Sequence, residues 1–114
     1  MMTLPSKVEV WMVDLRGGRG HEQQNERPAI VWRRQDHVEM AIIIPITKTA
    51  ERENLPYTHH IVPNSKNGLS EESIALVFQV RSISKERLVK KLGELGDMDI
   101  KIIAGLLKDL LKLD

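Results

Sequence analysis

Runs of β-branched and aromatic residues alternate along the chain with short polar breaks, and this pattern predicts a succession of short strands. The expected strands cover residues 8–14, 28–32, 38–44, 58–62 and 73–80. The run 38–44 is the most apolar, so we place it at the centre of the sheet. Glycines in 16–20 and turn-forming residues in 63–68 indicate loops between strands.

The pattern changes after Ile83, where helical spacing replaces strand runs. Ser84 is expected to begin a short helix that runs to Lys91 and ends at Gly93. Asp97 is expected to cap a second helix. Its apolar positions form one stripe, made of Ile102, Ile103, Leu106, Leu107, Leu110 and Leu111. Strands followed by helices predict a mainly β protein, a small antiparallel barrel with a C-terminal helix packed on it.

Composition limits the classes of function. A length of 114 residues fits a single domain, 1–114. The chain has no cysteine, which excludes disulfides and thiolate metal sites. No signal peptide is indicated, and the longest apolar run is too short to cross a bilayer, so we expect a cytoplasmic protein that does not enter the membrane. With a formal net charge of +1, any nucleic-acid surface has to be local.

Two residues next to expected strands are candidates for phosphate chemistry. Arg27 follows the glycine-rich break, and its guanidinium suits the oxygens of a phosphodiester. The alternative is a local ion pair with Glu22 or Glu26. Thr47 follows the central strand, where its hydroxyl could contact a substrate oxygen or only the adjacent backbone.

The loop before Arg27 carries further polar candidates. Glu22 could act as a general base, and His21 titrates near neutral pH. Gln23 and Gln24 could contact base edges. Each of these side chains fits a solvated loop equally well.

No metal or other cofactor is expected. His59 and His60 are neighbours on a strand, so their side chains point to opposite faces and do not readily share a metal ion. The glycine-rich run 17–20 lacks the Gly-Lys-Ser/Thr of a phosphate-binding loop.

Together these segments resemble the MazF/PemK toxins. Residues 10–15, VWMVDL, resemble the V-W-x-V-D-L strand of that family, and residues 20–28, GHEQQNERP, resemble its G-x-E-Q-x-G-x-R-P loop in the form of the Kid/PemK branch. Residues 43–47 resemble its V-V-P-I-T strand end. Residues 68–83 and 85–93 are similar to the segments that follow, so the resemblance runs from about Val8 to the C-terminus.

The resemblance implies an SH3-like, CcdB-like (PemK-like) twisted barrel that forms a homodimer and binds a cognate antitoxin. It also implies metal-independent cleavage of single-stranded RNA at short sequences through attack by the 2′-OH. The catalytic residues expected on this basis are Arg27, Thr47, Glu22 and His21, with the choice of base between the last two open. The expected RNA-binding residues are Arg19, Gln23, Gln24, Lys48, Gln79 and Arg81.

The chain departs from the family pattern in three places. Asn25 replaces a loop glycine, and the turn 33–36 is short and basic, which could shift RNA preference. Leu76 and Phe78 replace the Arg and Asp proposed as acid and base in the Kid branch. The alternatives are therefore a catalytically weak nucleic-acid-binding module or a CcdB-like topoisomerase poison, although Arg27 and Thr47 count against the poison.

Overall fold

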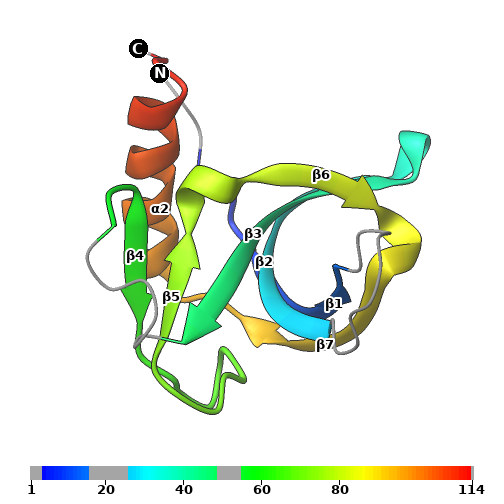
Figure 1. The fold of residues 1–114 in the computed structure, drawn as a ribbon, viewed down its shortest axis with the longest axis horizontal. Coiled ribbons are helices and arrows are strands. Elements are labelled where there is room, and N and C mark those ends of the chain that lie inside the picture. The colour runs from blue at the N-terminus through cyan, green and yellow to red at the C-terminus, as the bar shows by residue number, and fades with distance from the viewer. Residues whose placement is uncertain (1–3, 16–25, 49–54, 114) are drawn as a thin grey trace.

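The computed structural model describes residues 4–15, 26–48 and 55–113. Antiparallel strands precede one C-terminal helix (Figure 1), so the expected fold class is confirmed. The strands are β1 (Glu9–Asp14), β2 (Glu26–Gln35), β3 (Met40–Lys48), β4 (Thr58–Ile61), β5 (Ser73–Leu76), β6 (Arg81–Ser84) and β7 (Leu88–Glu94), and the helix is α2 (Asp97–Leu110). Single 3₁₀ turns occupy Asp36–Val38, Val77–Gln79 and Lys85–Arg87.

Strand β3 organises the sheet, whose order is β4-β5-β3-β2-β1-β7 with β6 also paired to β3. The first half of β3, through Ile43, pairs with β6, and its last residues, from Ile46, pair with β5. Pro45 lies between these two segments of β3, so its missing N–H does not interrupt the pairing with β6 or with β5. Within the described ranges β6 and β7 do not pair, and the strands curve into a twisted barrel that stays open (Figure 1).

Three sequence expectations are corrected. Residues 84–91 are not a helix but a 3₁₀ turn followed by β7. The expected strand 73–80 ends at Leu76, and the unpredicted β6 follows. Helix α2 has Gly96, not Asp97, at its N-cap, although Asp97 still places a favourable negative charge in the first turn.

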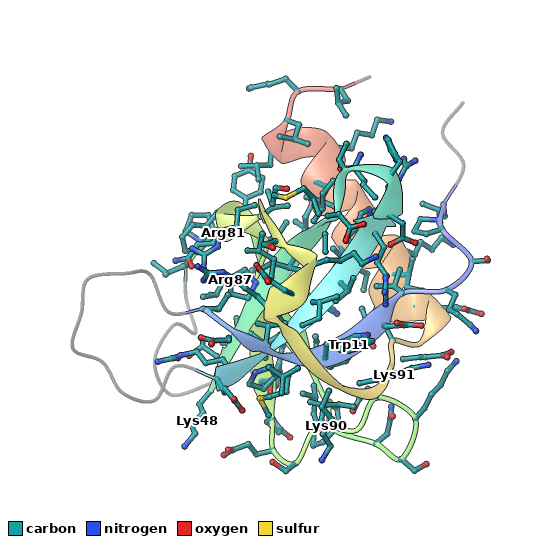
Figure 2. All side chains as sticks on the ribbon, turned by 90° about the vertical axis from the view of Figure 1, so that its right-hand side faces the viewer. Trp11, Lys48, Arg81, Arg87, Lys90 and Lys91 are labelled. Carbon is teal, nitrogen blue, oxygen red and sulfur yellow. The ribbon has the colours of Figure 1, made fainter. Side chains whose placement is uncertain are left out.

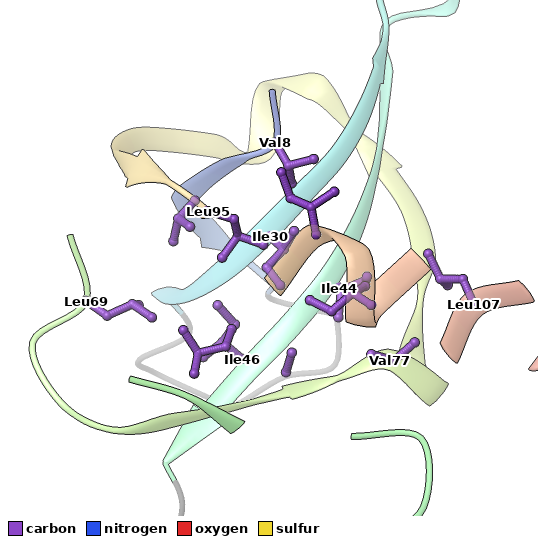
Figure 3. Close-up of a cluster of buried hydrophobic side chains, with 13 residues drawn as sticks. Val8, Ile30, Ile44, Ile46, Leu69, Val77, Leu95 and Leu107 are labelled. Carbon is purple, nitrogen blue, oxygen red and sulfur yellow. The ribbon is translucent and has the colours of Figure 1, made fainter. Parts of the chain in front are cut away.

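The apolar side chains form two clusters, one on each face of the curved sheet. The larger cluster lies under α2 and includes Ile30, Ile44 and Ile103, all with no exposed surface (Figure 3). The smaller cluster includes Val13, Val31 and Ile43. Because neighbouring residues on β2 and β3 alternate between the two clusters, both strands are buried on both faces and are held firmly.

The expected apolar stripe of the C-terminal helix is also corrected in part. The side chains that α2 buries are Ile100, Ile103 and Leu107. Ile102 and Leu111, which we expected on the packed face, are exposed.

Candidate active site

A cavity of about 530 Å³ opens where β2 begins and β3 ends. Arg27, Thr47 and Lys48 line it together with Leu69 and Glu71, and we call it the Arg27 groove. Three predicted site residues are therefore brought to one place, Arg27 from one strand and the adjacent Thr47 and Lys48 from a strand about 20 positions later.

The register of β2 and β3 explains why Arg27 and Thr47 lie at the same site. Ala29 is opposite Pro45 and Ile30 is opposite Ile44 in this antiparallel pair. The pairing ends at Ala29 and Pro45, two residues from Arg27 on β2 and two residues from Thr47 on β3, and beyond it β3 pairs with β5. The groove opens between the two strand ends, and both side chains line it, so both can face one phosphate group bound there.

The charges that line the groove balance. Arg27 and Lys48 carry positive charge, and Glu26 and Glu71 carry negative charge. The Lys48 ammonium lies 3.8 Å from the Glu71 carboxylate, and both side chains are more than half exposed. Arg27 is exposed, and none of the ion pairs among the described residues involves it.

One wall of the groove is a loop fixed by a buried asparagine. The Asn67 side-chain oxygen accepts hydrogen bonds from the backbone N–H groups of Asn64 and Leu69, and its amide donates to the Val62 carbonyl. Gly68 follows with φ +72°, and a Cβ there would lie 2.1 Å from the Leu92 carbonyl oxygen. The turn-rich composition of residues 63–68 predicted a turn, but nothing in it indicated that this turn walls the site.

The remaining predicted residues are elsewhere or lie outside the described ranges. Gln79 and Arg81 do not line the groove, and Arg81 is well separated from Lys48 in Figure 2. Leu76 is buried and Phe78 is partly exposed in the following turn. The residues singled out from the sequence that lie outside the described ranges are Arg19, His21, Glu22, Gln23, Gln24 and Asn25.

The two adjacent histidines bind different partners, as their alternation predicts. His59 Nε2 lies 2.7 Å from Asp99 of α2, whereas His60 Nε2 lies 2.8 Å from Glu72. Among the residues that the structure describes, no group of three His, Cys, Asp or Glu side chains is placed to hold a metal ion. The same residues contain no helix long and apolar enough to cross a membrane.

Comparisons with known proteins are consistent with the geometry. A family model described as a PemK-like, MazF-like toxin of type II toxin-antitoxin systems matches residues 6–111. An endoribonuclease MazF of Staphylococcus saprophyticus is 30% identical over 96 residues, which are 82% of this chain and 79% of that protein.

Solved structures support the fold. The Mycobacterium tuberculosis toxin MazF-mt6 has a TM-score of 0.73 at 19% identity and covers 93% of this chain and 98% of its own. MazF of Deinococcus radiodurans has a TM-score of 0.74 at 21% identity, with 98% and 100% covered. A mycobacterial endoribonuclease in complex with its cognate antitoxin has a TM-score of 0.70 at 20% identity, with 99% and 98% covered.

Proposed function

The chain belongs to the PemK-like, MazF-like toxins of type II toxin-antitoxin systems, and from that premise we propose that it cleaves single-stranded RNA in the Arg27 groove. The observation that carries the proposal is that Thr47 and the exposed Arg27 line one groove, where two strands with buried middles come to an end. The relative from Staphylococcus saprophyticus, named an endoribonuclease, supports the same class of reaction.

The proposed reaction is an internal transesterification. The RNA 2′-oxygen forms a bond to the adjacent phosphorus as its proton passes to a base, and the bond from phosphorus to the 5′-oxygen breaks as that oxygen takes up a proton. The products are a 2′,3′-cyclic phosphate and a 5′-OH. Because the nucleophile is the 2′-OH, no metal is needed to generate one, and DNA is not a substrate.

Each groove residue has a role in this proposal. The Arg27 guanidinium binds the non-bridging oxygens and stabilises the charge that develops on them in the transition state. The Thr47 hydroxyl donates a hydrogen bond to a phosphate oxygen, and Lys48 adds positive charge. Glu22 or His21 removes the 2′ proton.

The family also suggests partners. We propose that the chain is a cytoplasmic homodimer that a cognate antitoxin inhibits, in line with the antitoxin complex known for the mycobacterial endoribonuclease. Closed two-fold dimers are the most common soluble assemblies.

A second candidate function is RNA binding with little cleavage. Leu76, which is 6% exposed, and Phe78 have no group that transfers a proton. The acid and base of the Kid branch are therefore missing at these positions, and a protein without substitutes for them would bind RNA but cleave it slowly.

The test is cleavage of a long single-stranded RNA in EDTA, with mapping of the new 5′ ends. We expect Arg27→Ala to lower the rate about 10²–10³-fold, the effect of removing one donor to a developing oxyanion. Lys101→Ala, at an exposed cation on α2, is the matched control and leaves the rate unchanged, and a DNA of the same sequence stays intact. Equal rates for Arg27→Ala and the control contradict the proposal, and RNA binding without new ends selects the second candidate.

A further inference from the structure

A second hollow of about 550 Å³ lies at the far end of β2 from the Arg27 groove. Residues 4–7, which precede β1, form one side of it, and Trp32, Arg33 and Arg34 form the other. We call this hollow the Trp32 notch. From Arg27 to Arg33 the chain advances six residues along a strand, which corresponds to about 20 Å.

The charge of the Trp32 notch differs from that of the groove. Lys7, Arg33 and Arg34 line it and no carboxylate does. Arg33 is exposed and has no ion pair within the described ranges. Lys7 and Arg34 each have one carboxylate at 3.7 Å, Glu94 and Asp36 respectively. Such exposed pairs contribute little, so a phosphate group can replace the carboxylate at Lys7. The Arg34 guanidinium also lies over the Trp11 ring, 5.6 Å from its centroid, so Lys7 and Arg33 are the two cations that we assign to phosphate.

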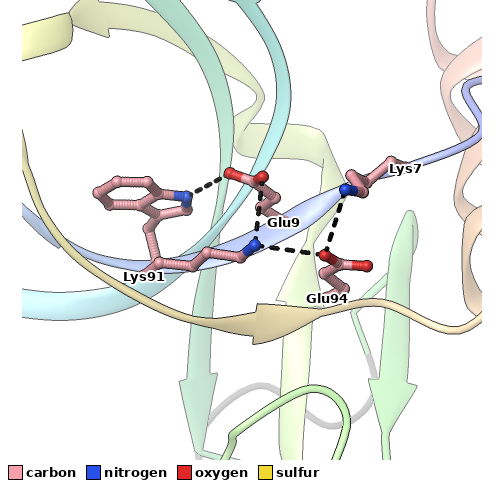
Figure 4. Close-up of polar contacts among 5 residues, drawn as sticks. Lys7, Glu9, Lys91 and Glu94 are labelled. Atoms are coloured by element: carbon pink, nitrogen blue, oxygen red, sulfur yellow. Dashed lines mark hydrogen bonds and ion pairs between the residues drawn. The ribbon is translucent and has the colours of Figure 1, made fainter.

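Those two carboxylates do not neutralise the region. Asp36 also binds Lys85 at 2.8 Å, and Glu94 also binds Lys91 at 3.2 Å (Figure 4). Lys91 also pairs with Glu9 at 3.5 Å. The region therefore holds three carboxylates against five cations, which are Lys7, Arg33, Arg34, Lys85 and Lys91, and positive charge remains in excess. The hydrogen bond from Lys85 lowers the pKa of Asp36, and the hydrogen bond from Lys91 lowers the pKa of Glu94.

The Trp32 notch also offers an aromatic surface. The Trp32 indole is half-buried and packs against the large core cluster, which fixes its orientation. Sites for single-stranded nucleic acid combine cations that follow the backbone with an aromatic ring on which a base stacks. The basic residues Arg33 and Arg34, which depart from the family pattern and were expected in a turn, lie in the last part of β2 and contribute to a hollow with both components.

We propose that the Trp32 notch binds the sugar-phosphate backbone of the same single-stranded RNA, outside the cleavage site. This inference rests on the proposed function and extends it. The described lining of the groove has no net charge, so it provides little non-specific attraction for a polyanion. The notch supplies that attraction, and its contacts raise the affinity for RNA long enough to reach both hollows.

The test compares RNA lengths in a binding assay that does not depend on cleavage. The ligands are 2′-O-methyl RNAs of about 5 and about 16 nucleotides, the range of single-strand site sizes in proteins. For the long ligand, removing two cations by Lys7→Ala with Arg33→Ala should weaken binding about tenfold and reduce the slope of log affinity against log salt by about 1.4. The short ligand should bind unchanged. The matched control removes two exposed cations of α2, Lys101→Ala with Lys108→Ala, and changes neither affinity.

Cleavage of unmodified RNA separates this proposal from the previous one. In the Lys7/Arg33 double variant we expect KM to rise for long RNA while kcat stays the same.

If wild type cuts no RNA but the length-dependent binding loss is seen, the cleavage proposal fails and the proposal for the Trp32 notch stands. If long RNA binds both proteins equally, the notch proposal is overturned. It is also overturned if the double variant loses affinity for poly-glutamate but keeps it for long RNA, because the hollow then binds acidic peptides.

Discussion

The Arg27 groove and the Trp32 notch occupy opposite ends of β2 and differ in charge and in how their walls are built. The groove has balanced charges and a wall fixed by the buried Asn67 and by Gly68. The charged side chains that line the notch are all positive, and one of its sides is a segment outside the sheet. A rigid site whose charges balance can position one phosphate group but attracts a polyanion only weakly. An open site with excess positive charge attracts a polyanion strongly but does not position one phosphate group.

This division has a structural origin in the strand that joins the two sites. The middle of β2, residues 29–31, is buried on both faces. Only its ends can present polar side chains, and the antiparallel register decides what each end meets. At one end Arg27 shares the groove with Thr47, and at the other Arg34 pairs with Asp36 of the exposed turn. Mutations at one end should therefore leave the other intact.

The largest effect should come from the groove wall. Gly68→Ala places a Cβ 2.1 Å from the Leu92 carbonyl oxygen at φ +72°, so the loop must move. We expect the free energy of unfolding to fall by about 3 kcal/mol, measured by urea titration. Below the transition, cleavage should drop while the length-dependent RNA affinity of the Trp32 notch remains.

A glycine on α2 provides the control. A Cβ at Gly105 has no atom within 4 Å, and Gly105 lies inside the helix. Gly105→Ala should therefore raise the free energy of unfolding by about 1 kcal/mol. A Gly68→Ala variant as stable as wild type would show that the loop is not a rigid wall, and the contrast between the two hollows would lose its basis.

The second effect concerns the hydroxyl opposite Arg27. Thr47→Val keeps the shape of the side chain but removes its hydrogen bond to the phosphate, and kcat should fall by about 10–100-fold, as for a bond to a charged group. Thr47→Ser should keep most of the activity. Single-turnover kinetics on a short RNA measures both. Equal loss in the two variants would assign Thr47 to packing and not to substrate contact.

The sequence predicts the groove better than the strands around it. Arg27 and Thr47 could be found because motif order and the ends of apolar runs locate them. The strand β7 could not, since it has a register shift on either side of its pairing with Trp11 and Met12. Such bulges disrupt the alternation that identifies a strand. The apolar spacing of Leu88 and Leu92 then fits a helix, and only the pairing with β1 overrides that preference.

The sequence could not predict the Trp32 notch or the groove wall, for a different reason. The Trp32 notch needs residues 4–7 to lie against the end of β2, and the wall needs Gly68 to meet Leu92. Both are contacts between distant segments. Composition showed that 33–36 is basic and that 63–68 is a turn, but not what each of them faces.

A smaller effect should come from changing the charge balance of the groove. Glu71→Gln removes the carboxylate 3.8 Å from Lys48 and leaves the groove lining with a net positive charge. The affinity for short RNA should rise about 2–5-fold, the scale of an exposed ion pair. Glu72→Gln is the matched control, because this neighbouring carboxylate binds His60 and does not line the groove. If the two variants bind short RNA equally, the balance of charge in the groove does not limit binding.

The smallest effect should come from Asp36, beside the Trp32 notch. Its pKa is lowered from the ordinary carboxyl value, mainly by the hydrogen bond from Lys85. A lowered pKa means that the folded state favours the charged form, so the stabilisation is present above the unfolded value of about 3.9 and disappears as pH falls through the lower folded value. The Tm of Asp36→Asn should therefore lie slightly below that of wild type at pH 7, and the two should converge below that window. Convergence would confirm that Asp36 stabilises the fold through its charge, which Lys85 and Arg34 share. A Tm difference that persists at low pH would instead indicate that Asp36 acts through its shape in the turn.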